Sequence, residues 1–265
     1  MKNETVKNKA IQSSKIRKVD LFKVFLRSFF VQSVWNYRNM ISVGFESCLF
    51  PVVKRLYPDL TARKQFLKRH LKFFNGHPYM VSYALGVSIR LEEENSKGQQ
   101  NACVQLDKLK ELLISPLGAL GDQLFWFTLK PVSLTVGALG IALFDTIGFK
   151  IGAISFAFLL YNIPHLYLRY IGIVEGYHHG LRISEFIQRE RFEQLRKWYM
   201  YIGMAASLGL VLLFLKNFWE QGFYPLSFFL GAMLYAYVAR KIIRNFYQTC
   251  VVTVIFFVFL ALIIL

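Results

Sequence analysis

Five long apolar stretches occupy most of the second half of the chain and limit its fold more than any other feature. They cover about 132–148, 151–171, 199–216, 223–239 and 246–265. Each is near the roughly 17–25 residues that a helix needs to cross a bilayer, although several are at the shorter end. The sequence therefore predicts an all-α, polytopic integral membrane protein with about five spans in its C-terminal half.

Basic residues between these stretches predict how the chain crosses the membrane. One group lies between the second and third stretches and another between the fourth and fifth: Arg182, Arg189, Arg191, Arg196, Lys197, Arg240, Lys241 and Arg244. The linkers at 149–150 and 217–222 carry few charges. Because cytoplasmic loops are enriched in Lys and Arg, this distribution places the N-terminus in the cytoplasm and Leu265 outside.

The chain ahead of the spans is strongly basic. Residues 1–72 hold 16 Lys/Arg and 4 Asp/Glu, so +12 of the formal net charge of +16 lies there. Such a region suits nucleic acid, anionic lipid or an acidic protein. No nucleic-acid recognition motif accompanies the charge, so we expect no nucleic acid and favour the lipids of the cytoplasmic leaflet.

We expect three parts along the chain. Residues 1–20 form a disordered basic tail, because they are rich in polar residues with few apolar positions. Residues 21–131 form a region of amphipathic and re-entrant helices, and residues 132–265 form the transmembrane region. Apolar residues recur at helical spacing from Leu21 to Phe30, which predicts a basic amphipathic helix in the membrane interface. Residues 63–72 predict a cytoplasmic helix.

Two segments, 73–90 and 112–131, are apolar but interrupted by Gly, Pro and polar residues. Four polar side chains lie there among aromatic residues: Asn75, His77, Asp122 and Gln123. Polar groups at membrane depth are costly, and they persist where they pair, line a cavity or bind a ligand. We therefore expect broken or re-entrant helices, which are tolerated inside protein or beside a watery cavity. For 30–53 and 73–90, interfacial, re-entrant and crossing arrangements all stay open.

Several blocks of the sequence resemble one protein family. They read Phe-Phe-Asn-Gly-His-Pro-Tyr at 73–79, Leu-Glu-Glu-Glu at 91–94 and Gly-Asp-Gln-Leu-Phe-Trp-Phe-Thr-Leu-Lys-Pro at 121–131. Shorter matches in the same order extend the resemblance over about residues 25–180. The chain resembles the IID membrane subunit of the mannose/fructose/sorbose family of the phosphoenolpyruvate-dependent sugar phosphotransferase system. Four positions depart from the family pattern, with Thr, Ser, Gly and Arg usual at Gly76, Gln123, Phe127 and Lys130.

The resemblance implies a subunit of the bacterial inner (cytoplasmic) membrane. It would form a hexose channel with a IIC subunit, as a trimer of IIC–IID pairs. Cytoplasmic IIA and IIB components would relay a phosphoryl group from phosphoenolpyruvate, and IIB would phosphorylate the sugar. This chain would thus belong to an enzyme complex without a phosphorylated or catalytic residue of its own. No cofactor is implied, and three widely spaced cysteines give no metal-type pattern.

Six residues are candidates for contact with the hexose: Asn75, His77, Glu92, Glu93, Asp122 and Trp126. Amide, imidazole and carboxylate groups bond sugar hydroxyls, and aromatic rings cover the C–H faces. Each candidate also has a structural interpretation. Asn75 and Asp122 are typical helix-capping residues, and His77 could be a buried core side chain with its hydrogen bonds satisfied. The acidic run 92–94 suits a solvated helix end, and Trp126 suits an interface anchor.

The departures from the family pattern leave a second function open. A diverged IID paralogue would keep the scaffold and act as a regulatory or scaffold subunit that moves no sugar. The bulky Phe127 and the changes at Gly76 and Gln123 motivate this alternative. Sugar uptake by the assembled complex distinguishes the two functions.

Overall fold

A computed structural model of the chain describes residues 16–99, 101–187, 189–221, 224–243, 248, 250–256 and 258. These residues are mostly helical, and no β-strand occurs among them. The predicted all-α fold class is therefore confirmed for the described residues. The chain forms two compact units, residues 1–206 and 207–265. Most of the predicted tail at 1–20 and of the fifth apolar stretch lies outside the described residues.

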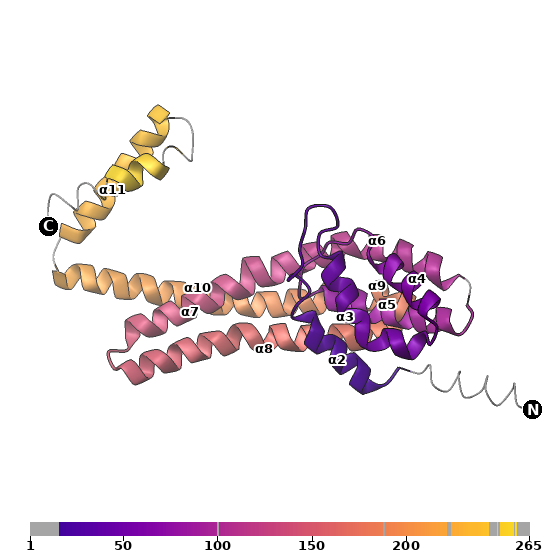
Figure 1. Cartoon of the computed structure of the whole chain (residues 1–265). Helices are drawn as coiled ribbons and strands as arrows, with labels where there is room; N and C mark the ends of the chain where they lie inside the picture. The colour runs from indigo at the N-terminus through magenta and orange to yellow at the C-terminus, as the bar shows by residue number, and fades with distance from the viewer. Residues whose placement is uncertain are drawn as a thin grey trace, which may run out of the picture. The chain divides into compact units, whose positions relative to one another are not determined.

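The first unit contains the helices of Figure 1 up to the start of α10. They are α2 (Lys18–Ser28), α3 (Ser42–Leu56), α4 (Leu60–His70), α5 (Val81–Ser96), α6 (Ala102–Gly121), the π-helix η1 (Asp122–Leu129), α7 (Lys130–Leu143), α8 (Ile147–His179), the 3₁₀ turn η2 (Gly180–Arg182), α9 (Ile183–Phe186) and the first part of α10 (Arg189–Gln221), whose residues from 207 on belong to the second unit. The second unit contains α11 (Tyr224–Ile243), where Tyr235 stacks on Phe256 with ring centroids 4.2 Å apart.

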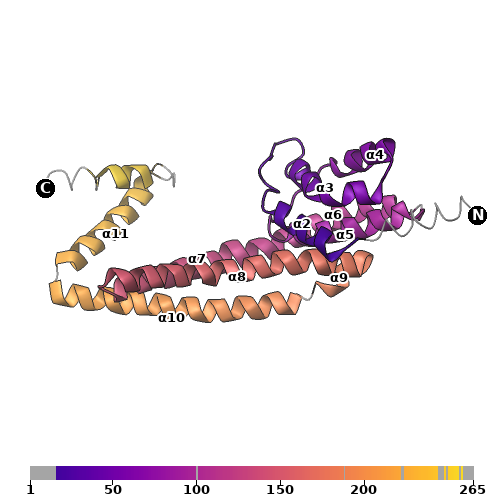
Figure 2. The ribbon, with the colours of Figure 1, turned by 60° about the horizontal axis from the view of Figure 1, so that its bottom comes forward.

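Helix α5 is enclosed by the other helices of the first unit. All of its residues from 81 to 89 are buried, because they are small or apolar on every side of the helix, as interior helices are. Helices α3, α6 and α8 pack against it, and Figure 2 shows α3 and α4 on one side of α5 and α8 on the other. Segment 73–90 therefore comprises a non-helical entry up to residue 80 and the first half of this central helix.

Three glycines let α5 and α8 approach closely. Gly172 and Gly176 lie one turn apart on α8, and Gly86 lies on the facing side of α5. A Cβ atom on Gly86 would lie 2.2 Å from the Ile173 carbonyl oxygen, and one on Gly176 would lie 2.3 Å from the Tyr83 carbonyl oxygen. Because these are backbone atoms that cannot move aside, the glycines set the distance between the two helices.

Residues 102–143 form one continuous helical run made of α6, η1 and α7. The sequence predicts a broken or re-entrant helix within 112–131. This prediction is wrong, because the chain stays helical there and widens into a π-helix. Pro131 follows directly, and its missing N–H and bulky ring disturb the preceding turn of a helix. Within η1, the Thr128 hydroxyl donates to the Gln123 carbonyl oxygen at 2.9 Å and so satisfies one backbone acceptor of the widened turn.

Among the described residues, three helical segments are long and apolar enough to cross a membrane: Ala102–Leu143, Ile147–Glu185 and Glu190–Asn217. They contain most of the first three predicted stretches, and α7 and α8 run side by side in both views (Figures 1 and 2). The fourth stretch coincides with α11, which is not among the three. The total of about five spans stays a prediction.

The basic N-terminal region folds into helices where the sequence predicts them, at α2 and α4. Helix α2 buries Leu21 and Val24, whereas Phe22, Leu26 and Phe29 of the expected apolar stripe are exposed. Much of that stripe therefore faces away from the protein core. Its position in the membrane interface stays a prediction.

We expect Gly176→Ala to lower the stability of the fold by about 1–3 kcal/mol, because the added Cβ overlaps the α5 backbone. Gly152→Ala is the matched control on the same helix, since a Cβ there meets no atom within 4 Å. Thermal unfolding of the full chain in one detergent measures both changes. Equal melting temperatures for the two variants would contradict the close approach of α5 and α8.

Candidate functional site

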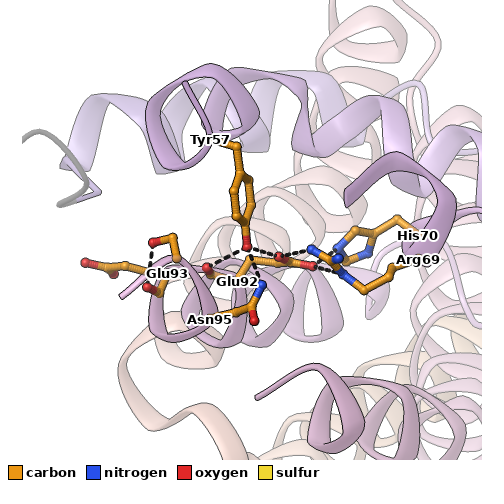
Figure 3. A network of polar contacts seen from close by, with 7 residues as sticks. Tyr57, Arg69, His70, Glu92, Glu93 and Asn95 are labelled. Atoms are coloured by element: carbon orange, nitrogen blue, oxygen red, sulfur yellow. Dashed lines mark hydrogen bonds and ion pairs between the residues drawn. The ribbon is translucent and has the colours of Figure 1, made fainter. Parts of the chain in front are cut away.

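Helix α5 carries two buried carboxylates, Glu92 and Glu93, which are 1% and 2% exposed. Glu92 lies at the centre of a polar network that joins α3, α4 and α5 (Figure 3). The Tyr57 hydroxyl donates to Glu92 Oε2 at 2.6 Å. Arg69 donates through Nε to Oε1 at 3.1 Å and through Nη2 to Oε2 at 2.8 Å. His70 Nε2 lies 3.0 Å from Oε1, so both carboxylate oxygens are held by protein donors.

The network fixes the protonation of its members. Burial raises the pKa of Glu92, but hydrogen bonds from His70 and Arg69 outweigh burial and lower it to about 2. Burial lowers the pKa of His70 to about 4, so at neutral pH the imidazole is neutral and its Nε2–H donates to the ionised carboxylate. The bidentate guanidinium of Arg69 then supplies the compensating charge. Glu92 has the contacts of a structural anion that binds three helices together.

Glu93 also has partners inside the protein. Lys97 Nζ lies 2.7 Å from Glu93 Oε1, and the Tyr177 hydroxyl of α8 donates to Oε2. The third acid of the run, Glu94, is half-buried and pairs with Arg90 at 2.7 Å. The interpretation of this run as a solvated helix end is therefore wrong for its two buried members.

A second polar group lies where the segment before α5 meets η1. His77 is 3% exposed, and its ring stacks on Phe125 with centroids 5.1 Å apart and planes 13° apart. The Trp126 ring meets the same imidazole at 5.7 Å. Gly121 makes room for this contact, because a Cβ there would lie 2.2 Å from His77 Cγ. Burial lowers the pKa of His77 to about 4, and its Nε2 has no hydrogen-bond partner among the residues that the structure describes.

A cavity of about 680 Å³ opens between α7 and α8 beside Trp126. Its polar lining combines an aromatic ring, a cation, hydroxyls and an amide: Tyr79, Trp126, Lys130, Ser133, Tyr161 and Asn162. Lys130 Nζ lies over the Trp126 ring, 4.7 Å from its centroid. Ser133 Oγ is buried and has no hydrogen-bond partner within the described part of the chain, and the Tyr79 and Tyr161 hydroxyl oxygens lie 3.0 Å apart.

Two further polar side chains of α8 are buried next to Tyr79. Both ring nitrogens of His165 are buried, and no described residue forms a hydrogen bond with either of them. Its ring centroid lies 3.8 Å from that of Tyr79. Arg169 donates to Ser28 Oγ at 3.2 Å, and its guanidinium lies over the rings of Tyr79 and Phe29 at 5.1 and 4.7 Å. These side chains enlarge the polar group around the cavity. Across the described residues, no three or more His, Cys, Asp or Glu side chains are placed to hold a metal ion.

The structure brings some of the sequence candidates together and separates others. His77 and Trp126 touch each other beside the cavity. Glu92 and Glu93 lie in the helix-joining contacts described above, with their oxygens taken by protein partners. The candidates thus fall into two groups, one with unpartnered polar atoms and one without.

Asn75 and Asp122 are both exposed, and the capping interpretation is wrong for both. Helix α5 begins after Met80 without a side-chain cap. Asp122 continues the helical run of α6, where the backbone leaves no free end for a side chain to cap. Their side chains are therefore available at the surface.

Sequence reasoning missed the polar residues of α8. Tyr161, His165 and Arg169 recur at every fourth position within the apolar stretch 151–171. Residues with this spacing lie on one face of a helix, so the pattern could have identified them. Ser133 gives no comparable signal, because a single serine in an apolar helix is common and its place in the cavity depends on packing.

Comparisons with known proteins agree with one another. Residues 15–216 match the family model described as the PTS system mannose/fructose/sorbose family IID component. The chain is 35% identical over 198 residues to the mannose-specific EIID component of Escherichia coli (strain K12), across 74% of this chain and 68% of that protein. It is 31% identical over 202 residues to the fructose permease IID component of Bacillus subtilis (strain 168), across 76% and 71%.

A solved structure is similar over the same part of the chain. It is the cryo-EM structure of the mannose transporter ManYZ in complex with microcin E492 (MceA), at 34% identity and a TM-score of 0.58. The match covers 74% of this chain and 70% of that chain. The likeness therefore extends from sequence to backbone.

We expect Glu92→Gln to lower the stability of the fold by about 3–5 kcal/mol, because it leaves the Arg69 charge without its counter-charge and points an amide N–H₂ at a donor. Glu94→Gln is the matched control, and the loss of its more exposed ion pair with Arg90 should change stability by less than about 1 kcal/mol. Thermal unfolding in detergent compares the two. A Glu92→Gln chain as stable as Glu94→Gln would show that the network does not hold the helices together.

Proposed function

The chain belongs to the mannose/fructose/sorbose family of phosphotransferase-system IID components, and from this premise we propose that it forms, with a IIC subunit, the channel that imports a hexose. The family assignment drawn from the motifs is confirmed by the family model and by the relatives. The likeness to a solved mannose transporter is the observation that carries the proposal to transport. The import is coupled to phosphorylation of the sugar by a IIB component.

The assembly follows the family arrangement. IIC–IID pairs form a trimer in the bacterial inner membrane, with the N-terminus of this chain in the cytoplasm. The cytoplasmic IIA and IIB components carry the phosphoryl group, and this chain is not phosphorylated. The three long apolar segments cross the membrane together with the stretches at 223–239 and 246–265, which gives about five spans.

The hexose contacts this chain at the cavity beside Trp126. The indole covers the C–H face of the sugar, and the groups around it form hydrogen bonds with the hydroxyls. Ser133 Oγ supports this role because it is buried without a protein partner, a state that costs free energy unless another group bonds it. Lys130 and Asn162 line the same cavity and add a charged donor and an amide.

The other sequence candidates take supporting places in this proposal. His77 packs against the Trp126 ring with centroids 5.7 Å apart and so orients the indole. Asn75 and Asp122 are exposed and complete the site where the IIC subunit meets this chain. Glu92 and Glu93 act indirectly, because their contacts hold α5 and hence the segment that presents His77.

The alternative of a non-transporting paralogue rests on three departures from the family pattern. Gly76 has open space, with its nearest neighbour 3.9 Å from a built Cβ. Gln123 and Phe127 are exposed, Phe127 to 78%, and they leave the packing of η1 undisturbed. None of the three lines the cavity of Trp126. These three positions leave the cavity unchanged and favour the transporting subunit, and the fourth departure, Lys130, which lines the cavity, keeps the positive charge of the usual Arg.

We expect Trp126→Leu to raise the half-saturating hexose concentration for uptake at least about fivefold, the equivalent of roughly 1 kcal/mol of lost ring contact. Trp198→Leu is the control, because Trp198 is an exposed tryptophan of α10 outside the cavity. Phosphoenolpyruvate-dependent uptake of mannose, fructose and sorbose is measured in vesicles that hold this chain with its IIC, IIA and IIB partners, supplied with the soluble carriers that pass the phosphoryl group from phosphoenolpyruvate to IIA.

Two outcomes contradict different parts of the proposal. Equal half-saturating concentrations for both tryptophan variants, at equal amounts of folded complex, would remove the hexose from the Trp126 cavity. Failure of the unaltered complex to take up any of the three sugars would overturn transport itself and favour the paralogue.

A further inference from the structure

We propose that the groove between α2, α3 and α4 is a binding site for an anionic phospholipid. The groove has a volume of about 680 Å³ and is lined by both cationic and apolar side chains. The lipid phosphate pairs with the cations, and the first part of its acyl chains lies on the apolar surface. This site is separate from the Trp126 cavity and does not depend on the hexose.

The charge of the groove is of one sign. Lys23, Arg27, Lys54 and Arg63 line it, and no carboxylate is among its lining residues. Two of the cations are held in place by backbone oxygens. Arg27 Nη1 donates to the Ser47 carbonyl at 3.1 Å, and Arg63 Nε donates to the Tyr57 carbonyl at 2.7 Å. Carbonyl partners orient a guanidinium without neutralising it, so the groove keeps its positive charge for an anion.

The apolar part of the groove selects an amphiphile over a soluble anion. Leu26 and Phe50 line it and are 48% and 45% exposed, and the guanidinium of Arg27 lies over the Phe50 ring at 5.6 Å. A free phosphate or an acidic protein surface satisfies the cations but leaves these side chains in water. A phospholipid satisfies both, because its anionic headgroup and its acyl chains are joined in one molecule.

The groove also lies near the predicted membrane boundary. Helix α2 contacts α8 where Arg169 donates to Ser28 Oγ at 3.2 Å and where Phe25 packs edge-on against Tyr170 with centroids 5.5 Å apart. These contacts fall at the end of the apolar stretch 151–171, just before the basic segment that the positive-inside rule assigns to the cytoplasm. Lipid headgroups of the cytoplasmic leaflet lie at the same depth as this groove. A site in the middle of the apolar stretch would be too deep to contact a headgroup.

The test uses the full chain in a neutral detergent with a phosphatidylglycerol that carries a fluorescent acyl chain as probe. Binding is followed by fluorescence anisotropy, with unlabelled phosphatidylglycerol, phosphatidylcholine and inorganic phosphate as competitors. We expect Lys23→Gln/Lys54→Gln to weaken lipid binding about tenfold or more, because the double variant removes two of the four cations that attract the anionic headgroup. Both lysines are exposed, so melting temperatures should stay unchanged.

Lys64→Gln/Lys68→Gln is the matched control, with the same loss of charge from exposed positions of α4 outside the groove. It should weaken binding less than about twofold. Equal weakening of lipid binding by the two double variants would show that binding depends on net charge and not on the groove, and would overturn the proposed site. Competition by phosphatidylcholine or inorganic phosphate as strong as that by phosphatidylglycerol would overturn the lipid assignment. Unchanged lipid binding in the groove variant, with weaker binding of purified IIB, would make the surface a protein-docking site instead.

Discussion

The burial of two carboxylates on α5 is the constraint on which the first unit depends. A helix enclosed on all sides cannot leave Glu92 or Glu93 unpaired, because an isolated ion in a protein interior is very costly. Glu92 is therefore satisfied by Tyr57, which directly follows α3, and by Arg69 and His70 of α4. Glu93 is satisfied by Lys97 and by Tyr177 of α8. The same two charges thus fix the neighbours of α5 on both sides.

This frame positions the groups to which we assign the hexose. Close packing of α5 on α8 through Gly86, Gly172 and Gly176 sets the place of the segment that carries His77 and Tyr79. The π-helix η1 then presents Trp126 to His77 and to the cavity between α7 and α8. π-Helical turns often occur at functional sites, because the widened turn redirects side chains that a regular helix would bury. The packing of α5 on α8 therefore helps to position the proposed hexose site.

The sequence predicts the helices better than it predicts their contacts. Apolar periodicity suffices for α2, and long apolar runs suffice for α7, α8 and residues 199–216 of α10, because these signals depend on neighbouring residues. Most partners of Glu92 and Glu93 lie 22 to 84 residues away along the chain, so no local pattern identifies them. The exception is Lys97, four residues after Glu93, a spacing that can be read from the sequence. The sequence indicates an interruption of the helix before Pro131, but it does not identify that interruption as the π-helix η1. The four-residue spacing of Tyr161, His165 and Arg169 was a readable signal for the polar face of α8.

The central claim is that the hexose contacts the Trp126 cavity and not the buried acids of α5. The most direct measurement is the rate of thiol alkylation in the assembled complex, with Cys48, Cys103 and Cys250 replaced by alanine and one new cysteine introduced. Asn162→Cys reports on the cavity, and Ser96→Cys reports on the surroundings of Glu93, whose carbonyl its hydroxyl contacts at 2.7 Å. We expect a transported hexose to slow alkylation of Asn162→Cys at least about fivefold and to leave Ser96→Cys unchanged. Protection of Ser96→Cys without protection of Asn162→Cys would contradict the account.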